Sequence, residues 1–164
     1  MADELQQKLV DYVENAQAME QNVSKMLDSM ISTTDDPEIG EVLRHHKQET
    51  EEHERRLRDR LDALGAGTST TKQAGAVGSA LLKGVGDMAR ADKPGKNARD
   101  GFMTEHMEIA AYQLLERLAE RAGDEQTAEV ARENRADEEA MARKIDSNWD
   151  KFLDLTLAEA GIQA

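Results

Sequence analysis

Acidic residues and one histidine interrupt the apolar faces of four helical stretches, at positions where a soluble helix normally carries hydrophobic side chains. The first stretch has one glutamate in its apolar seam, and the second has a histidine and a glutamate three residues apart. The third has two glutamates with the same spacing, and the fourth has one glutamate. Residues three positions apart lie on one face of a helix. The residues concerned are Glu20, His46, Glu49, Glu105, Glu108 and Glu138.

Four antiparallel helices of similar length would bring these residues to one level, in a layer of five carboxylates and one imidazole. Burying several ionised carboxylates together costs on the order of several kcal/mol, through desolvation and mutual repulsion. Protons can neutralise the layer by raising the pKa values of the carboxyl groups. Two divalent cations neutralise it better, and such ligands on facing helices are typical of di-iron and di-manganese bundles. The pattern therefore predicts a two-metal site.

Each part of this pattern also has an ordinary explanation. In a chain with 34 acidic residues, a single glutamate such as Glu20 is usually part of a solvated face, and a surface pair such as Glu105 and Glu108 is common. The hypothesis rests on the coincidence of all four stretches. His53 lies in the same seam as His46 and is either a ligand, a group that contacts a ligand, or a rim residue. Tyr112 is either a core residue or a neighbour of the site that donates a hydrogen bond or passes an electron.

The elements that must position these residues are four long helices and a shorter one. Asp36 is expected to cap the second helix, with Pro37 at its first position, and Gly65 and Gly123 are expected to end the second and third. Apolar residues at steps of three and four predict the long helices over residues 3–31, 37–64, 98–122 and 125–146.

Residues 65–98 differ from the rest of the chain because they are rich in Gly, Ala, Ser and Thr and contain Pro94. They predict a long connection that holds short helical pieces, as in bundles where one connection crosses from end to end. The fold class expected is therefore all-α, an antiparallel four-helix bundle with a crossover between the second and third helices. One domain is expected to cover residues 1–164.

Composition excludes several classes of protein. Without cysteine there is no disulfide and no thiolate metal site, and a net charge of -13 argues against binding nucleic acid. The most apolar stretch, residues 74–85, is interrupted by Lys83 and is too short to span a membrane. The first residues have neither a basic start nor an apolar run, so we expect no signal peptide and a cytoplasmic protein.

Four motifs contain the polar residues: Ala18-Met19-Glu20, His46-x-x-Glu49-Thr50, Glu105-x-x-Glu108-Ile109-Ala110-x-Tyr112 and Glu138-Glu139. Together they resemble the YciE/YciF-like family of ferritin-like proteins, which are short bacterial proteins grouped with stress responses. The resemblance covers most of the chain and implies a ferritin-like bundle with a dinuclear site. It also implies that the six polar residues are the ligands, and that two metal ions, iron before manganese, are the cofactors.

The resemblance further implies stress-related oxidation of iron by oxygen or peroxide. In ferritins, however, two helices carry Glu-x-x-His, whereas here the order is His46-x-x-Glu49 and Met141 stands three residues after Glu138. This departure speaks against a ferritin-type ferroxidase. The alternative is a helical stress or interaction protein whose metal is structural or absent. Long two-helix hairpins often pair, so a homodimer is compatible with either function.

Overall fold

The computed structural model describes residues 2–66 and 92–162, and the regular secondary structure of this part of the chain is all helix, with no strand. Its five helices are α1 (Ala2–Ser32), α2 (Pro37–Ala63), α4 (Lys93–Ala122), α5 (Glu125–Asp146) and α6 (Trp149–Glu159). The prediction of an all-α fold is confirmed. The short helical pieces predicted within residues 65–98 lie mostly outside the described residues, which resume at residue 92.

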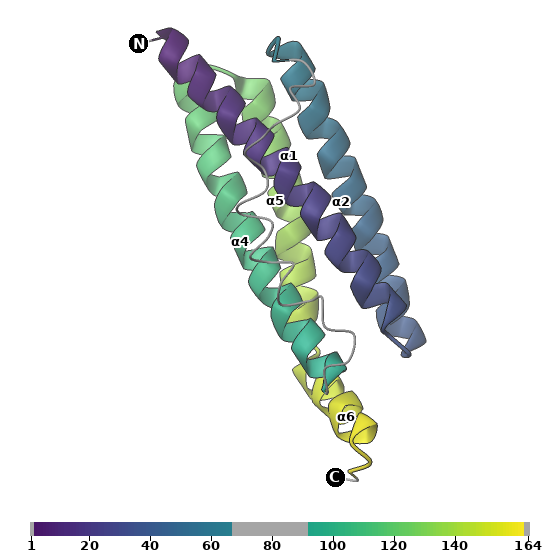
Figure 1. The fold of residues 1–164 in the computed structure, drawn as a ribbon. Coiled ribbons are helices and arrows are strands. Elements are labelled where there is room, and N and C mark those ends of the chain that lie inside the picture. Colours follow the sequence, from purple (N-terminus) through teal and green to yellow (C-terminus); the bar gives the residue numbers. More distant parts are fainter. Residues whose placement is uncertain (1, 67–91, 163–164) are drawn as a thin grey trace.

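Two antiparallel helical hairpins form the bundle. Figure 1 shows α1 paired with α2 and α4 paired with α5, while α6 continues below α5. The end of α2 and the start of α4 lie at opposite ends of the bundle, so the chain crosses its length between them. The predicted crossover between the second and third long helices is therefore confirmed.

Local sequence signals set the turns between paired helices. Asp36 accepts a hydrogen bond from the backbone N–H of Ile39 at 2.9 Å, and Pro37 follows in the first turn of α2. Between α4 and α5, Gly123 adopts φ 73°, a left-handed conformation that costs glycine little. Asp124 then accepts the N–H of Thr127 at 3.0 Å and caps α5. Both turns are short, which keeps each pair of helices antiparallel.

The start of α4 differs from the prediction. The helix begins at Lys93 rather than at residue 98, so residues 93–98 are helical and not part of the connection. Pro94 lies in the first turn, where its missing N–H needs no partner. The N–H of Gly95 donates to Thr156 Oγ1 at 2.9 Å, and that of Lys93 donates to Glu159 at 3.0 Å. Side chains from α6 thus satisfy amides that this first turn leaves free.

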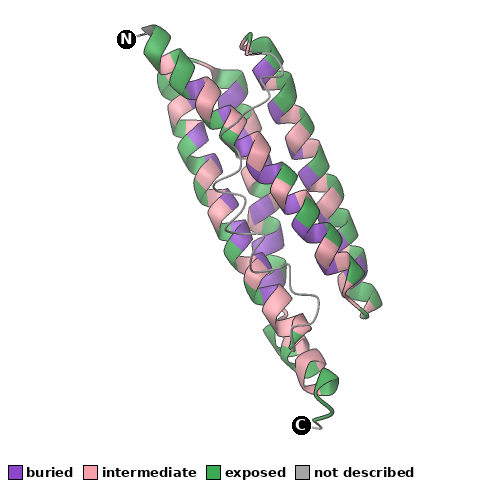
Figure 2. Cartoon of the chain, in the orientation of Figure 1, coloured by how far each residue is buried: buried purple, intermediate pink, exposed green. Residues whose placement is uncertain are grey.

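The apolar core consists of two clusters with a polar layer between them. The first cluster uses the early part of α1 and the end of α2, where Leu9, Val13 and Leu57 are fully buried. The second uses the late part of α1 and the end of α5, including Leu27 and Ile145. Figure 2 shows buried positions along each of the four long helices. On each of these helices, buried glutamate or histidine side chains occupy the level between the clusters.

No helix in the described ranges, 2–66 and 92–162, is both long enough and apolar enough to cross a membrane.

Candidate metal centre

Six acidic and imidazole side chains from four helices are almost completely withdrawn from solvent at the middle of the bundle. Each has no more than 1% of its surface exposed, which is rare for charged residues unless they are paired or bind a metal. α1 contributes one, α2 two, α4 two and α5 one, and they are Glu20, His46, His53, Glu105, Glu108 and Glu138. Five of these six belong to the set expected from the sequence.

The first part of the cluster surrounds His46. Its Nε2 lies 3.3 Å from Glu105 Oε1 and 3.5 Å from Glu138 Oε2. Its other nitrogen, Nδ1, lies 3.1 Å from Glu49 Oε2. The imidazole therefore joins two buried carboxylates to a third that lies nearer the surface.

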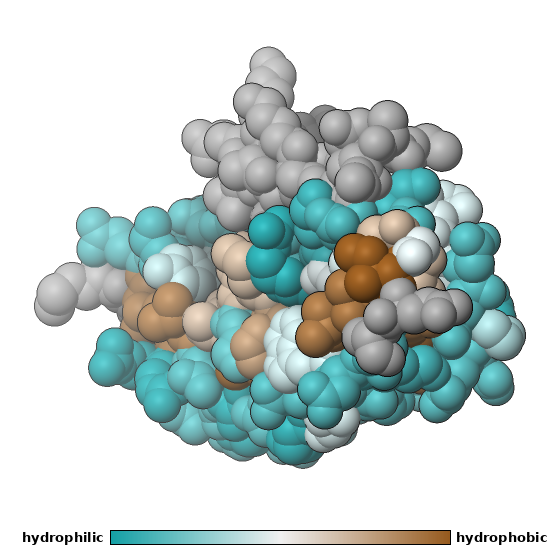
Figure 3. All heavy atoms as spheres, turned by 90° about the horizontal axis from the view of Figure 1, so that it is seen from below, coloured by the Kyte–Doolittle hydropathy of each residue, from teal (hydrophilic) through white to brown (hydrophobic). Residues whose placement is uncertain are grey.

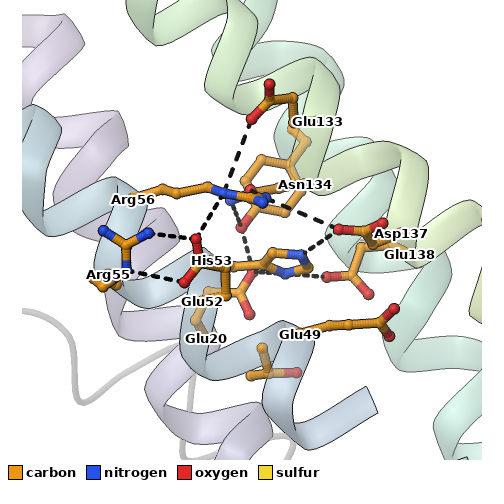
Figure 4. Close-up of polar contacts among 12 residues, drawn as sticks. Glu20, Glu49, Glu52, His53, Arg55, Arg56, Glu133, Asn134, Asp137 and Glu138 are labelled. Atoms are coloured by element: carbon orange, nitrogen blue, oxygen red, sulfur yellow. Dashed lines mark hydrogen bonds and ion pairs between the residues drawn. The ribbon is translucent and has the colours of Figure 1, made fainter. Parts of the chain in front are cut away.

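The second part surrounds His53, which the sequence left undecided between three roles. Its Nδ1 lies 2.9 Å from Glu138 Oε1 and 3.6 Å from Glu20 Oε1. On its outer side, Nε2 lies 3.1 Å from Asp137 Oδ2, and Figure 4 shows the ring projecting from α2 toward Asp137 and Glu138 of α5. His53 is thus inside the cluster rather than at a rim.

The two parts meet at Glu138. One carboxylate oxygen faces His46 and the other faces His53. In each of two groups, Glu20–His53–Glu138 and His46–Glu105–Glu138, the possible ligand atoms lie within 4.8 Å of one another. Glu138 therefore belongs to both groups of possible ligands.

Glu108 supplies a further test of fit. Both of its oxygens are buried, and neither has a hydrogen-bond partner among the residues that the structure describes. One oxygen of Glu20 and one of Glu105 are in the same condition. Leaving a buried acceptor unpaired costs about 1–3 kcal/mol, and more when the group is charged. Carboxylates and imidazoles are common ligands of divalent metal ions, so the residues present could hold a metal ion.

Protons balance the charges of the cluster while no metal is bound. Burial raises the pKa of Glu105 to about 8 and also raises the pKa values of Glu20 and Glu108. Burial alone would lower the pKa of His46, but its hydrogen bonds to Glu105 and Glu49 outweigh this and raise that pKa to about 11. The metal-free cluster therefore favours neutral carboxyl groups beside a charged imidazole.

Glu138 and His53 form the charged pair at the centre. Burial would raise the pKa of Glu138, but the hydrogen bond to His53 and the charge of His46 lower it overall. For His53, hydrogen bonds to Glu138 and Glu20 outweigh burial and raise the pKa to about 10. The lowered pKa favours the ionised form of the carboxylate that both groups share.

Tyr112 belongs to the site and is more than a core residue. It is fully buried, and its hydroxyl donates a hydrogen bond to Glu20 Oε1. The same hydroxyl accepts from Asn134 Nδ2 at 3.0 Å, and Asn134 Oδ1 accepts from Arg56 Nη1 at 2.9 Å. This chain of contacts holds one oxygen of Glu20 in place and reaches a partly exposed arginine.

The position of Glu49 differs from that of the other predicted ligands. Its side chain is 29% exposed and touches the outer nitrogen of His46, and it lies in neither three-residue group. Asp137, which sequence reasoning missed, has the matching place beside His53. Helical periodicity shows that both residues lie near the seam, but only the facing helix determines which carboxylate enters the cluster.

Comparison with known proteins places the chain in a family. A profile of the family described as "Domain of unknown function (DUF892)" matches residues 4–158. A crystal structure of a Xanthomonas campestris protein has a TM-score of 0.81 at 24% identity, covering 96% of this chain and 99% of its own.

Two further structures share the fold. The E. coli stress protein YciF has a TM-score of 0.82 at 15% identity, with 92% of this chain and 97% of its own covered. A Rhodopseudomonas palustris protein named YcfI has a TM-score of 0.72 at 22% identity, with 87% and 92% covered. The match along almost the whole chain and the shared bundle show that this protein belongs to the YciF-like family described as DUF892.

Proposed function

We propose that this protein is a ferritin-like di-metal protein that binds two iron or manganese ions at the middle of its bundle. The ligands are Glu20, His46, His53, Glu105, Glu108 and Glu138, with Glu49 beside them. The observation that carries the proposal is Glu108, a carboxylate with both oxygens buried and unpartnered within the described residues, beside two groups that share Glu138. If this layer had only a structural role, the protein would be more stable with an apolar side chain in place of Glu108.

The ions, when bound, would supply redox chemistry with oxygen or peroxide. The chain's own residues prepare the site for them. Glu49 and Asp137 each contact the outer nitrogen of an imidazole, which orients the ring and fixes which nitrogen faces inward. Tyr112 holds one oxygen of Glu20, and the first apolar cluster covers the site on one side. A stress-related role draws support from the name of the E. coli relative.

Metal content tests the proposal directly. Protein purified without added metal or chelator is analysed for its elements, and metal-free protein is titrated with Mn(II) and Fe(II) under anaerobic conditions. We expect close to two equivalents of iron or manganese per chain. Glu51→Ala, a change of an exposed acid on α2, serves as the control and should keep the same stoichiometry. Absence of bound metal, together with no response to either ion, would defeat the proposal.

A further inference from the structure

A large cavity opens at the end of the bundle where α1 turns into α2. It has a volume of about 480 Å³ and lies between that hairpin and the helices α4, α5 and α6. Its walls are mainly aliphatic and thioether side chains, among them Met26, Met30, Val42, Ile145 and Leu155. Figure 3 views the molecule from this end and shows hydrophobic surface gathered within a hydrophilic surround. Pockets that bury small molecules have this size and this kind of lining.

The cavity extends inward to the candidate metal centre. Glu105, which faces His46, is one of its lining residues, and Met141, one turn after Glu138, is another. On α4 the wall between the opening and Glu105 is formed by small residues, Ala98 and Gly101. A Cβ on Gly101 would contact Ile145 Cδ1 at 3.4 Å, so glycine at this position lets α4 approach α5 closely beside the cavity.

The charged residues that line the cavity comprise five acids and three lysines, so positive charge is not in excess there. Lys151 Nζ lies 2.5 Å from Glu38 Oε2 and 3.5 Å from Asp36 Oδ1. Glu159 Oε2 accepts a hydrogen bond from the backbone N–H of Lys93. The chain as a whole carries a charge of -13, which repels anions. Neither the charged residues at the opening nor the net charge of the chain therefore favours a ligand with an anionic head group. The chemistry that matches this cavity is a neutral, apolar molecule.

We propose that the cavity binds a neutral aliphatic molecule, such as a medium-chain alcohol or aldehyde, with one end directed toward Glu105. The position of that end makes the molecule an organic substrate of the metal centre, and this part of the inference rests on the proposed function. Binding itself does not, since the apolar walls would hold the chain in metal-free protein. Transfer of apolar surface from water supplies the driving force.

The first experiment measures binding in metal-free protein. The neutral fluorophore N-phenyl-1-naphthylamine is titrated, and 1-decanol and decanoate are then tested as competitors. We expect saturable binding that 1-decanol displaces at lower concentration than decanoate. Failure of the fluorophore to bind, or preferential displacement by decanoate, would overturn the proposal.

Two half-buried valines provide matched variants. Val42 lines the cavity and packs on the second core cluster, whereas Val130 packs on the first cluster at the far end of the bundle. We expect Val42→Trp to weaken fluorophore binding at least about tenfold, a change of about 1.4 kcal/mol, and Val130→Trp to leave it unchanged. Leu155→Trp, which enters the cavity from α6, should repeat the effect if Val42→Trp fails to fold by circular dichroism. Equal affinities in all folded variants would contradict the assignment.

A second copy of the chain is the competing occupant. If the cavity served as a dimer interface, Val42→Trp would change the mass measured by light scattering. Binding of the fluorophore would also dissociate the wild-type dimer. We expect neither change. Either result would overturn the proposal in favour of an interface.

The link to the metal centre is tested separately with cobalt(II) as the spectroscopic probe. We expect 1-decanol to alter the visible absorption of cobalt-loaded wild type but not that of Val42→Trp. An unchanged spectrum in a wild type that does bind 1-decanol would overturn the substrate role. If 1-decanol displaces the fluorophore but the protein binds no metal, the proposed function is overturned and the assignment of the cavity stands.

Discussion

Glu108 has no partner among the described residues, and this makes it the most informative single position. Replacing it with methionine, which has similar length and no charge, removes a buried acceptor from the metal-free protein. We expect Glu108→Met to stabilise that protein by about 2 kcal/mol and to abolish most of the stabilisation that metal provides. Thermal unfolding with EDTA and with Mn(II) measures both effects. Glu51→Ala should change neither, and a metal-free Glu108→Met protein less stable than wild type would contradict the explanation.

Glu138 and Glu49 separate a shared ligand from a neighbouring one. The sequence pattern suggested Glu49 as a ligand, but in the structure Glu138 lies in both groups and Glu49 in neither. We expect Glu138→Gln to lose both metal equivalents, whereas Glu49→Ala weakens binding and keeps a measurable stoichiometry. Isothermal titration with Mn(II) distinguishes the two. Equal loss in both variants would show that Glu49 enters the centre when metal is present.

The residues found from sequence were those whose seam position alone indicates burial. Glu20, Glu105 and Glu138 fall between apolar residues on their own helices, so periodicity was sufficient. His53 shared that signal, but its role depends on the register of α2 against α5, which brings Glu138 within 2.9 Å. Asn134 likewise becomes part of the site only through Tyr112. Such contacts arise from packing between helices, which a single sequence does not specify.

Helix boundaries also depend partly on neighbouring residues and partly on contacts with distant parts of the chain. Asp36 with Pro37, and Gly123 with Asp124, act within a few residues, and the predicted turns there agree with the structure. The early start of α4 depends on acceptors that follow it by about 60 residues, as the Gly95–Thr156 bond shows. No local pattern around Pro94 could have revealed those acceptors.

The contact between α6 and the first turn of α4 should be measurable. Thr156→Val keeps the shape of the side chain but removes the acceptor for the Gly95 N–H. We expect a loss of about 1 kcal/mol in the free energy of unfolding and faster amide hydrogen exchange over residues 93–97. Leu153→Ala, a change at an exposed position of the same helix, is the control. Unchanged exchange in Thr156→Val would mean that α6 does not hold this turn.

For the whole molecule, the raised pKa values predict how stability varies with pH. The pKa of Glu105 rises from 4.5 to about 8, and that of His46 from 6.5 to about 11. The stability that each contributes is complete below its unfolded pKa and is lost as pH rises through its folded pKa. Metal-free protein should therefore melt at a lower temperature at pH 8 than at pH 5.

Metal should have the opposite dependence on pH, because cations replace the protons of the cluster. We expect the increase in melting temperature caused by Mn(II) to grow between pH 5 and pH 8. Differential scanning calorimetry at constant ionic strength, with and without EDTA, measures both trends. A metal-free protein that becomes more stable over this interval, or a metal effect that shrinks, would contradict the charge balance described for the cluster.

The division of the cluster between the two hairpins has a consequence for the order of folding. Each three-residue group takes members from both hairpins, since Glu138 comes from α5 and the histidines from α2. Paired helices joined by short turns form quickly from local contacts, whereas the crossover delays the meeting of the hairpins. In stopped-flow refolding, metal capture should consequently follow helix formation as a later phase. Only chains whose hairpins have docked in register would then retain a cation, so metal retention would distinguish correctly assembled chains from the rest.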